Sequence, residues 1–218
     1  MSRGIDLLDY DAIRGTERAT MFVLETASPV VVVGSAQRTD LIDPDREPAW
    51  RRRRRRGGGG VVLLQPGDLW VDWWIPTDDA RWRPDATRAA TLAGSWWADA
   101  LRERVDGEVT VHDGPLVTNG DMRDVCFAGV GPGEVLVDGR KAVGLTQWRV
   151  REGTLVSTLL PVAPTVALVG LLASPPTGLA DALNHATRAS LGLDDPATVL
   201  ESLERLSGPI ERSTLAFA

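Results

Sequence analysis

Apolar residues recur at helical spacing in a few segments of the chain and at strand spacing in many short ones. Between residues 85 and 105 they stand three or four positions apart, which predicts a long amphipathic helix with its tryptophans in the core. A similar pattern predicts a helix over residues 5–18. The apolar run of residues 29–34 predicts a buried strand.

Short strands separated by turn residues fill the middle of the chain. Asp138-Gly139 is typical of a two-residue hairpin turn, and Arg151-Glu152-Gly153 predicts a second hairpin. Pro66-Gly67-Asp68 separates two earlier strands. The predicted strands cover residues 61–65, 69–75, 108–111, 125–128, 134–137, 141–150 and 154–160. The later ones are expected to form an antiparallel meander.

Helices are predicted again near the C-terminus, over residues 165–172, 178–191 and 196–206, with Pro175-Pro176 separating the first two. Strands grouped in the middle and helices at both ends predict an α+β fold, in which a mixed, largely antiparallel sheet is covered by helices. A length of 218 residues suits one medium domain, so we expect residues 1–218 to form a single domain.

Composition narrows the class of protein. A net charge of −6 argues against broad nucleic-acid binding, which needs a basic surface. No window approaches the ~20 apolar residues of a membrane span, and the first residues do not read as a secretion signal, so we expect a soluble, cytoplasmic protein. One cysteine excludes an internal disulfide framework, and His112 and His185 leave no recognisable zinc-ligand spacing, so we expect no metal.

Six consecutive arginines, Arg51 to Arg56, lead directly into four glycines, Gly57 to Gly60. Guanidinium groups match phosphate and carboxylate geometry, which favours an anion-facing loop over a plain solvated charge run. The glycines let the backbone approach a ligand and point N–H groups at an anion, although a glycine-rich hairpin bend has the same composition. The segment is not a nucleotide P-loop, because no Gly-Lys-Ser or Gly-Lys-Thr follows.

The chain has 23 arginines and a single lysine, Lys141. A guanidinium does not replace an ammonium whose pKa must be tuned, so this lysine is either required or a chance survivor of arginine-rich coding. The only cysteine, Cys126, precedes it by fifteen residues. A lone cysteine is commonly an inert buried thiol, but a neighbouring cation raises the thiolate fraction and allows attack on acyl thioesters. Gly144, inside a predicted strand, indicates a bulge, a close approach or tight packing.

Four segments taken together resemble the biotin/lipoate protein ligase superfamily. They are Arg-Arg-x-Gly-Gly-Gly-Gly-Val-Val at 54–62, the Pro-Gly-Asp turn at 66–68, Gly-Arg-Lys-x-Val-Gly-x-x-Gln-x-Arg at 139–149 and Gly-x-x-Gln at 34–37. The resemblance spans roughly residues 25–172 and leaves residues 173–218 as C-terminal helices. It implies the fold of the superfamily's catalytic domain.

Within that superfamily, Cys126-Phe127 before Gly139-Arg140-Lys141 looks most like the octanoyltransferases. The resemblance implies an acyltransferase that moves an octanoyl or lipoyl group from an acyl carrier protein to a lysine of a lipoyl acceptor domain, without a cofactor. Cys126 would carry the acyl group and Lys141 would hold its carbonyl or an activated phosphate. The implied substrate-binding residues are Arg55, Arg56, Gly58, Gly59, Gly60, Val61, Gly144 and Gln147.

The chain also departs from the family pattern. Leu64-Gln65 stands where many members have His-Asp, and Val156-Ser157-Thr158 where octanoyltransferases tend to have His-Gly-Ser. Two alternatives therefore stay open. One is a ligase that uses ATP and Mg²⁺ to form an acyl-adenylate from free lipoic or octanoic acid, which the arginine and glycine segment suits. The other is a non-catalytic relative that binds an acyl group or a partner.

Overall fold

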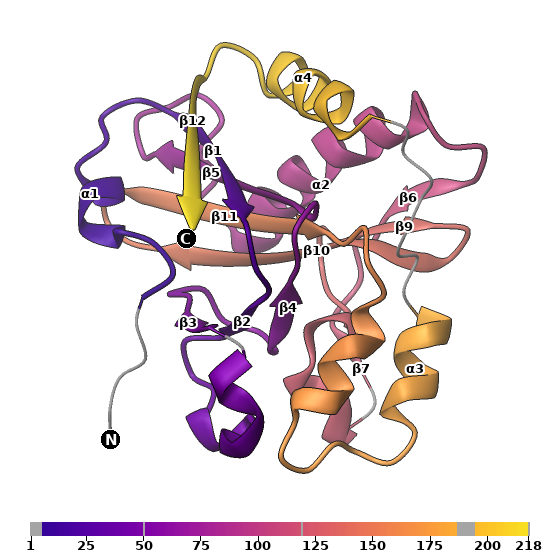
Figure 1. The fold of residues 1–218 in the computed structure, drawn as a ribbon. Helices are drawn as coiled ribbons and strands as arrows, with labels where there is room; N and C mark the ends of the chain where they lie inside the picture. Colours follow the sequence, from indigo (N-terminus) through magenta and orange to yellow (C-terminus); the bar gives the residue numbers. More distant parts are fainter. Residues whose placement is uncertain (1–5, 50, 119, 187–194, 218) are drawn as a thin grey trace.

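A large twisted sheet forms the centre of the computed structural model, which describes residues 6–49, 51–118, 120–186 and 195–217. Its seven strands follow the spatial order β12-β1-β5-β11-β10-β9-β6. Their bounds are β1 Thr20–Thr26, β5 Leu69–Pro76, β6 Val109–Val111, β9 Val135–Val137, β10 Arg140–Arg149, β11 Gly153–Leu160 and β12 Glu211–Phe217. All neighbours pair antiparallel except β1 and β12, which are parallel. The predicted α+β fold with a mixed, largely antiparallel sheet is thus confirmed (Figure 1).

Two long helices cover one face of this sheet. They are α2 (Ala86–Arg102) and α4 (Pro196–Ser207), drawn above the sheet in Figure 1. Their apolar sides pack with alternate sheet residues such as Val71, Trp73 and Val156 into one core cluster. Asp85 begins α2 by accepting a hydrogen bond from the Arg88 N–H, and the apolar spacing in the sequence predicted this helix correctly.

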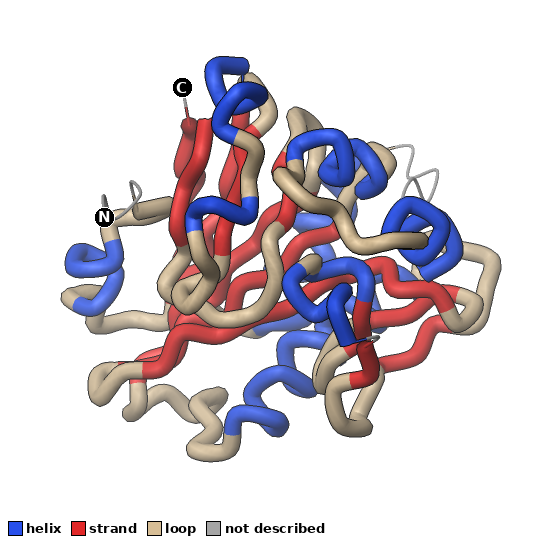
Figure 2. The backbone as a smooth tube through the Cα atoms, turned by 90° about the horizontal axis from the view of Figure 1, so that it is seen from below, coloured by secondary structure: helices blue, strands red, loops and turns tan. Residues whose placement is uncertain are grey.

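A layer of smaller elements covers the opposite face, and the core cluster on this side includes Trp70, Trp74 and Leu155. A three-stranded sheet, in the order β3-β2-β4, lies here, together with a two-stranded one, β7-β8. Seen from below, helical segments of this layer lie in front of the large sheet (Figure 2). The strands are β2 Val30–Val33, β3 Arg51–Arg54, β4 Val62–Leu64, β7 Val117–Thr118 and β8 Gly129–Val130. The helices are α1 Tyr10–Arg14, α3 Leu179–Ala186 and the 3₁₀ segments Thr39–Leu41, Pro44–Ala49, Gly120–Asp124, Cys126–Ala128 and Thr165–Leu171.

Three predicted elements differ from the structure. Residues 125–128 are not a strand, because the Ala128 N–H turns back to the Val125 carbonyl and forms a 3₁₀ helix. The helix predicted over residues 5–18 contains only Tyr10–Arg14 and stops at Gly15. The predicted helix over 165–172 is a 3₁₀ helix, and of the one predicted over 178–191 the structure shows Leu179–Ala186, while residues 187–191 lie outside the described residues.

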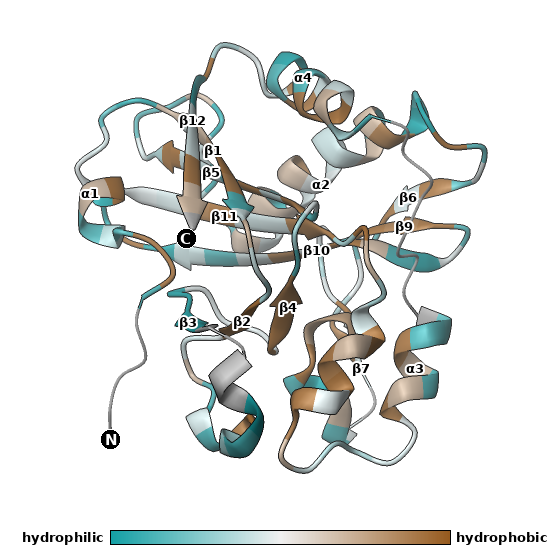
Figure 3. Cartoon of the chain, in the orientation of Figure 1, coloured by the Kyte–Doolittle hydropathy of each residue, from teal (hydrophilic) through white to brown (hydrophobic). Residues whose placement is uncertain are grey.

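The arginine run is a strand over Arg51–Arg54, so the prediction of a loop there is wrong. β3 pairs in parallel with the apolar β2, and Figure 3 shows this hydrophilic strand beside hydrophobic neighbours. The Arg54 guanidinium donates to the carbonyls of Gly34, Ser35 and Gln37 at 2.7–3.1 Å. Arg52 donates to the Thr39 carbonyl at 2.6 Å. These side chains therefore bind backbone oxygens of the segment that follows β2.

Candidate active site

Cys126 begins a 3₁₀ helix, and backbone contacts fix its position. Its N–H donates to the Val61 carbonyl at 3.0 Å, and the Val61 N–H donates to the Asp124 carbonyl at 2.7 Å. Gln37 holds the same loop, because its Nε2 donates to the Asp124 carbonyl at 2.8 Å. A Cβ at Gly60 would lie 2.6 Å from the Cys126 nitrogen, so the glycine loop must lack a side chain there. The two glycine-containing segments thus hold the cysteine in place.

Cys126 lies between two small cavities that share it with Arg55 and Leu145. The outer cavity, of about 120 Å³, is also lined by Gly59, Gly60, Arg123, Glu134 and Lys141. The inner cavity, of about 20 Å³, extends toward the large sheet and is lined by Val62, Trp70, Gly144, Thr146, Ser157, Thr158 and Leu159. The half-buried thiol is therefore at the junction of a polar mouth and a narrow interior.

The ammonium of Lys141, whose residue is only 1% exposed, lies among three oxygens. Its Nζ is 2.7 Å from Glu134 Oε2, 2.7 Å from the Cys126 carbonyl oxygen and 3.0 Å from the Gly129 carbonyl oxygen. It also lies 4.8 Å from the centre of the Phe127 ring, a cation–π distance. Lys141 is thus anchored to the cysteine loop itself, and all three of its N–H donors have acceptors.

Glu134 is a site residue that the sequence analysis missed. Its Oε2 accepts from the Gly131 N–H at 2.7 Å as well as from Lys141, and its Oε1 accepts from the Leu145 N–H at 3.0 Å. Such complete hydrogen bonding offsets the desolvation of a buried ion pair. A signal was present in the sequence, because a lone lysine within an apolar strand needs a counter-charge and Glu134 is the nearest acid in the preceding strand segment.

Arg55 is buried beneath the glycine loop, with its guanidinium bound to backbone oxygens. It donates to the Gly58 carbonyl at 2.7 and 3.1 Å, to the Gly60 carbonyl at 2.7 Å and to the Val32 carbonyl at 3.3 Å. Desolvation lowers its pKa from the ordinary value, and the charges of neighbouring groups, Cys126 foremost, oppose that shift. Arg55 faces both cavities and braces the loop between them.

A second acid that the sequence analysis missed lies in the sheet below the inner cavity. Asp72, in β5, is fully buried, and its Oδ1 accepts from Trp70 Nε1 at 2.5 Å. Its Oδ2 has no hydrogen-bond partner among the described residues. Desolvation raises the Asp72 pKa from 3.8 to about 7, more than the Trp70 and Ser157 side chains and the Arg55 charge lower it.

Four of the predicted substrate-binding residues do not line either cavity. Arg56 pairs with Asp6 at 2.9 Å and lies over the Tyr10 ring. Gln147 donates to the Ala86 carbonyl at the start of α2. Gly58 and Val61 contribute backbone groups that position Arg55 and Cys126. Gly59, Gly60, Gly144 and Arg55 do line the cavities, as do Cys126 and Lys141.

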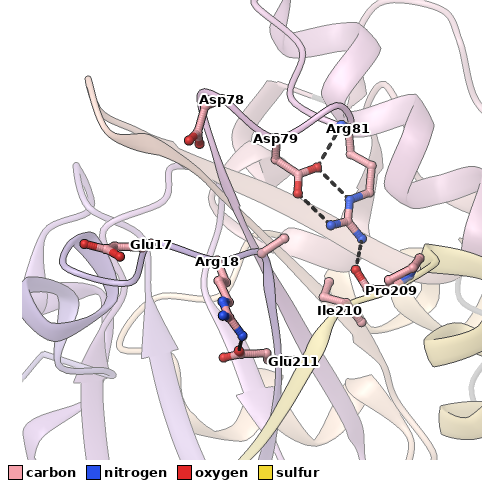
Figure 4. A pocket seen from close by; sticks show the side chains of 9 residues that line it. Glu17, Arg18, Asp78, Asp79, Arg81, Pro209, Ile210 and Glu211 are labelled. Atoms are coloured by element: carbon pink, nitrogen blue, oxygen red, sulfur yellow. Dashed lines mark hydrogen bonds and ion pairs between the residues drawn. The ribbon is translucent and has the colours of Figure 1, made fainter.

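Larger hollows also lie outside this pair of cavities. A groove of about 780 Å³ adjoins the outer cavity, because both are lined by Thr118, Arg123 and Val125. A second hollow, of about 490 Å³, lies where β12 begins, and Figure 4 shows its charged wall. There Arg81 binds Asp79 and the Pro209 carbonyl, and Arg18 pairs with Glu211.

Solved structures with a similar fold include several lipoate protein ligases. A T. acidophilum protein assigned as a lipoate protein ligase, with lipoic acid bound, aligns with a TM-score of 0.70 and 15% identity over 99% of this chain and 89% of that one. Lipoate-protein ligase A bound with ATP gives 0.70 and 16% over 100% and 90%. A bipartite lipoate protein ligase from Thermoplasma acidophilum gives 0.72 and 16% over 95% and 80%. No family model and no curated protein matches the sequence.

The chain is therefore an α+β protein with a central sheet and a cavity that Cys126 and Lys141 both line. More particularly, it has the fold of the lipoate-protein ligases. In the described part of the chain no helix is long and apolar enough to cross a membrane.

Proposed function

We propose that this protein transfers an acyl group of the octanoyl or lipoyl type from a carrier thioester, through Cys126, to a lysine of a lipoyl acceptor domain. The observation that carries the proposal is the position of Cys126 between the two cavities, with Lys141 bound to its carbonyl oxygen and Arg55 beside it. Both cations line the outer cavity together with the half-buried thiol.

The proposed reaction has two steps. The Cys126 thiolate attacks the acyl carbonyl, the bond to the carrier sulfur breaks, and the proton of the Cys126 thiol passes to the departing carrier thiol. The acceptor amine then attacks the acyl-cysteine, its nitrogen–carbon bond forms, the carbon–sulfur bond breaks, and the amine proton restores the thiol. The acyl chain extends toward the inner cavity, and the groove beside Arg123 accommodates the carrier's arm and then the acceptor.

Each tetrahedral intermediate carries a negative oxygen that needs donors. Gly59 and Gly60 line the outer cavity, and their amides donate to no backbone acceptor among the described residues, so we assign them this role. One such donor commonly contributes about 3 kcal/mol to transition-state stabilisation. Lys141 can assist only by exchanging one of its three present acceptors for the substrate oxygen.

An ATP-dependent lipoate ligase is the second candidate. It is favoured by the fold of the ATP-bound ligase and of the bipartite ligase, which is described together with its E2 lipoyl domain. The charges at the site weigh against it, since Lys141 and Arg55 are bound to protein oxygens. Of the cations that line the outer cavity, Arg123 alone contacts no acceptor among the described residues. One available guanidinium is little positive charge for binding a triphosphate. In this version ATP and Mg²⁺ are required.

The test is intact mass spectrometry of the protein after incubation with octanoyl-loaded carrier protein. We expect an octanoyl adduct that hydroxylamine removes, as it removes thioesters. The Cys126→Ala variant should form no adduct. The matched control is Ser95→Ala, which changes a side chain on α2 that donates only within its own helix and should leave the adduct unchanged. An adduct that persists in Cys126→Ala, or none in the wild type, refutes the cysteine mechanism.

A second assay separates the two candidates. Exchange of labelled pyrophosphate into ATP, dependent on added octanoic or lipoic acid, is expected of the ligase and not of the transferase. Exchange together with no carrier-dependent adduct assigns the protein to the ligase class.

A further inference from the structure

The wall of the inner cavity on the side of the large sheet carries polar groups. The cavity is lined by Trp70 and Ser157, and both stand next to Asp72 in the large sheet. Ser157 lies directly opposite Asp72 in the β5–β11 pairing, and Trp70 is two residues along β5. Cross-strand partners and residues two apart point to the same face of a sheet, so Asp72 faces the cavity side with them.

Asp72 is fully buried, and its Oδ2 has no hydrogen-bond partner among the described residues. A buried oxygen without a partner costs about 1–3 kcal/mol, so whatever occupies the adjoining space is selected for its ability to bond to it. A hydrocarbon end cannot do so, and burying one against Asp72 would retain the whole cost. The inner cavity is therefore poorly suited to the unsubstituted end of an octanoyl chain.

We propose that the inner cavity is a specificity site for an acyl chain that carries a hydroxyl group near its far end, with Asp72 and Ser157 as the residues that bind the hydroxyl. A hydroxyl suits Asp72 because it can donate to the carboxylate or accept from the protonated acid. The proposal rests on the acyl-binding role proposed above and narrows its substrate from octanoyl-type chains in general to hydroxylated ones.

The size of the cavity supports a small polar group. A volume of about 20 Å³ is close to the space of one water molecule, and a hydroxyl that replaces a bound water can keep that water's hydrogen bonds. The other polar side chains of the lining have acceptors of their own. Thr158 donates to the Val71 carbonyl, Thr146 to the Gly58 carbonyl, and the Arg55 guanidinium to the Gly58, Gly60 and Val32 carbonyls.

The experiment is isothermal calorimetry of the full chain with free acids, in pairs of equal length that differ only by an ω-hydroxyl. The octanoate and ω-hydroxyoctanoate pair comes first, followed by shorter pairs. We expect the hydroxy acid of at least one pair to bind roughly tenfold tighter. In Asp72→Leu the preference should vanish or reverse, whereas Asp72→Asn, which can still bond to a hydroxyl, should retain most of it.

The matched control is Thr154→Val. Thr154 is also buried in the sheet with an unpaired oxygen, but it lies opposite Ile75, whose side chain packs in the core on the other face. This variant should keep the wild-type preference. Equal affinity for both acids of every pair in the wild type, no binding of any acid, or an unchanged preference in Asp72→Leu overturns the inference.

The outcome is separable from that of the proposed reaction. A hydroxy-acid preference without an acyl-cysteine adduct leaves the specificity site standing and refutes the transfer mechanism. An octanoyl adduct on Cys126 without this preference supports the transfer mechanism and refutes the specificity site.

Discussion

The burial of Asp72 predicts a contribution to the stability of this protein that falls as pH rises through neutrality. Its pKa rises from 3.8 to about 7 mainly because burial disfavours the carboxylate. The folded protein therefore holds this proton more tightly than the unfolded chain does. The contribution is present in full below about pH 4 and is lost as pH rises through about 7. Since each pKa unit corresponds to about 1.4 kcal/mol, the loss amounts to about 4 kcal/mol.

The perturbation that isolates this effect is Asp72→Asn, which keeps the shape and an oxygen for Trp70 Nε1 but does not titrate. We expect the difference in unfolding free energy, variant minus wild type, to increase by about 4 kcal/mol between pH 4 and pH 8. Urea unfolding across that range measures it, and the difference removes the titration of other groups. Thr154→Val should give a flat difference. A flat or falling curve for Asp72→Asn would refute the assignment of a raised pKa.

Three further substitutions test the contacts that hold the site. Glu134→Gln places an amide against the buried Lys141 ammonium and should lower the unfolding free energy, measured in urea, by about 3–5 kcal/mol. The double variant Glu134→Leu with Lys141→Met should recover most of this loss. A Glu134→Gln variant as stable as wild type would contradict the ion pair. Gly60→Ala puts a Cβ 2.6 Å from the Cys126 nitrogen and should cost about 1–3 kcal/mol and change the rate at which a thiol reagent modifies Cys126. Gly58→Ala, with nothing within 4 Å of its Cβ, is the matched control and should change neither, so equal effects of the two would argue against the close approach. Arg55→Lys replaces a planar fork that binds three carbonyls by a point charge and should lower the melting temperature, with a loss of about 2 kcal/mol or more; a neutral outcome would show that the loop holds without the brace.

Much of the fold could be predicted, because in many segments the spacing of apolar residues and the turn residues match the elements that those segments form. The Asp138-Gly139 turn has both residues at positive φ, 50° and 73°, as a two-residue hairpin of this type requires, and β9, β10 and β11 follow as predicted. The edge strand β12 was missed because Glu211–Phe217 carries no strong apolar alternation. Its pairing with β1 connects the two ends of the chain, which local sequence patterns do not show.

The sequence predicted several of the residues that line the outer cavity but not the residues around them. Cys126 and Lys141 were identified from their rarity and family order, and both line the outer cavity. Arg56 and Gln147 were assigned to substrate binding because a sequence motif gives the spacing of residues along the chain but not the direction in which their side chains point. Asp72 was missed since a single acid between tryptophans in a strand gives no sign of which face it points to or of what lies above it.

The scarcity of lysine has a chemical consequence for a protein of the proposed type. Activated acyl groups modify any accessible amine, and the side chains of surface lysines are the usual sites of such side reactions. This polypeptide exposes none on its side chains, because its only lysine is shielded from solvent by Glu134 and the cysteine loop. Its basic surface is guanidinium, which stays protonated and does not act as a nucleophile. Apart from the α-amino group at the start of the chain, the amine available to react is the one that the acceptor brings.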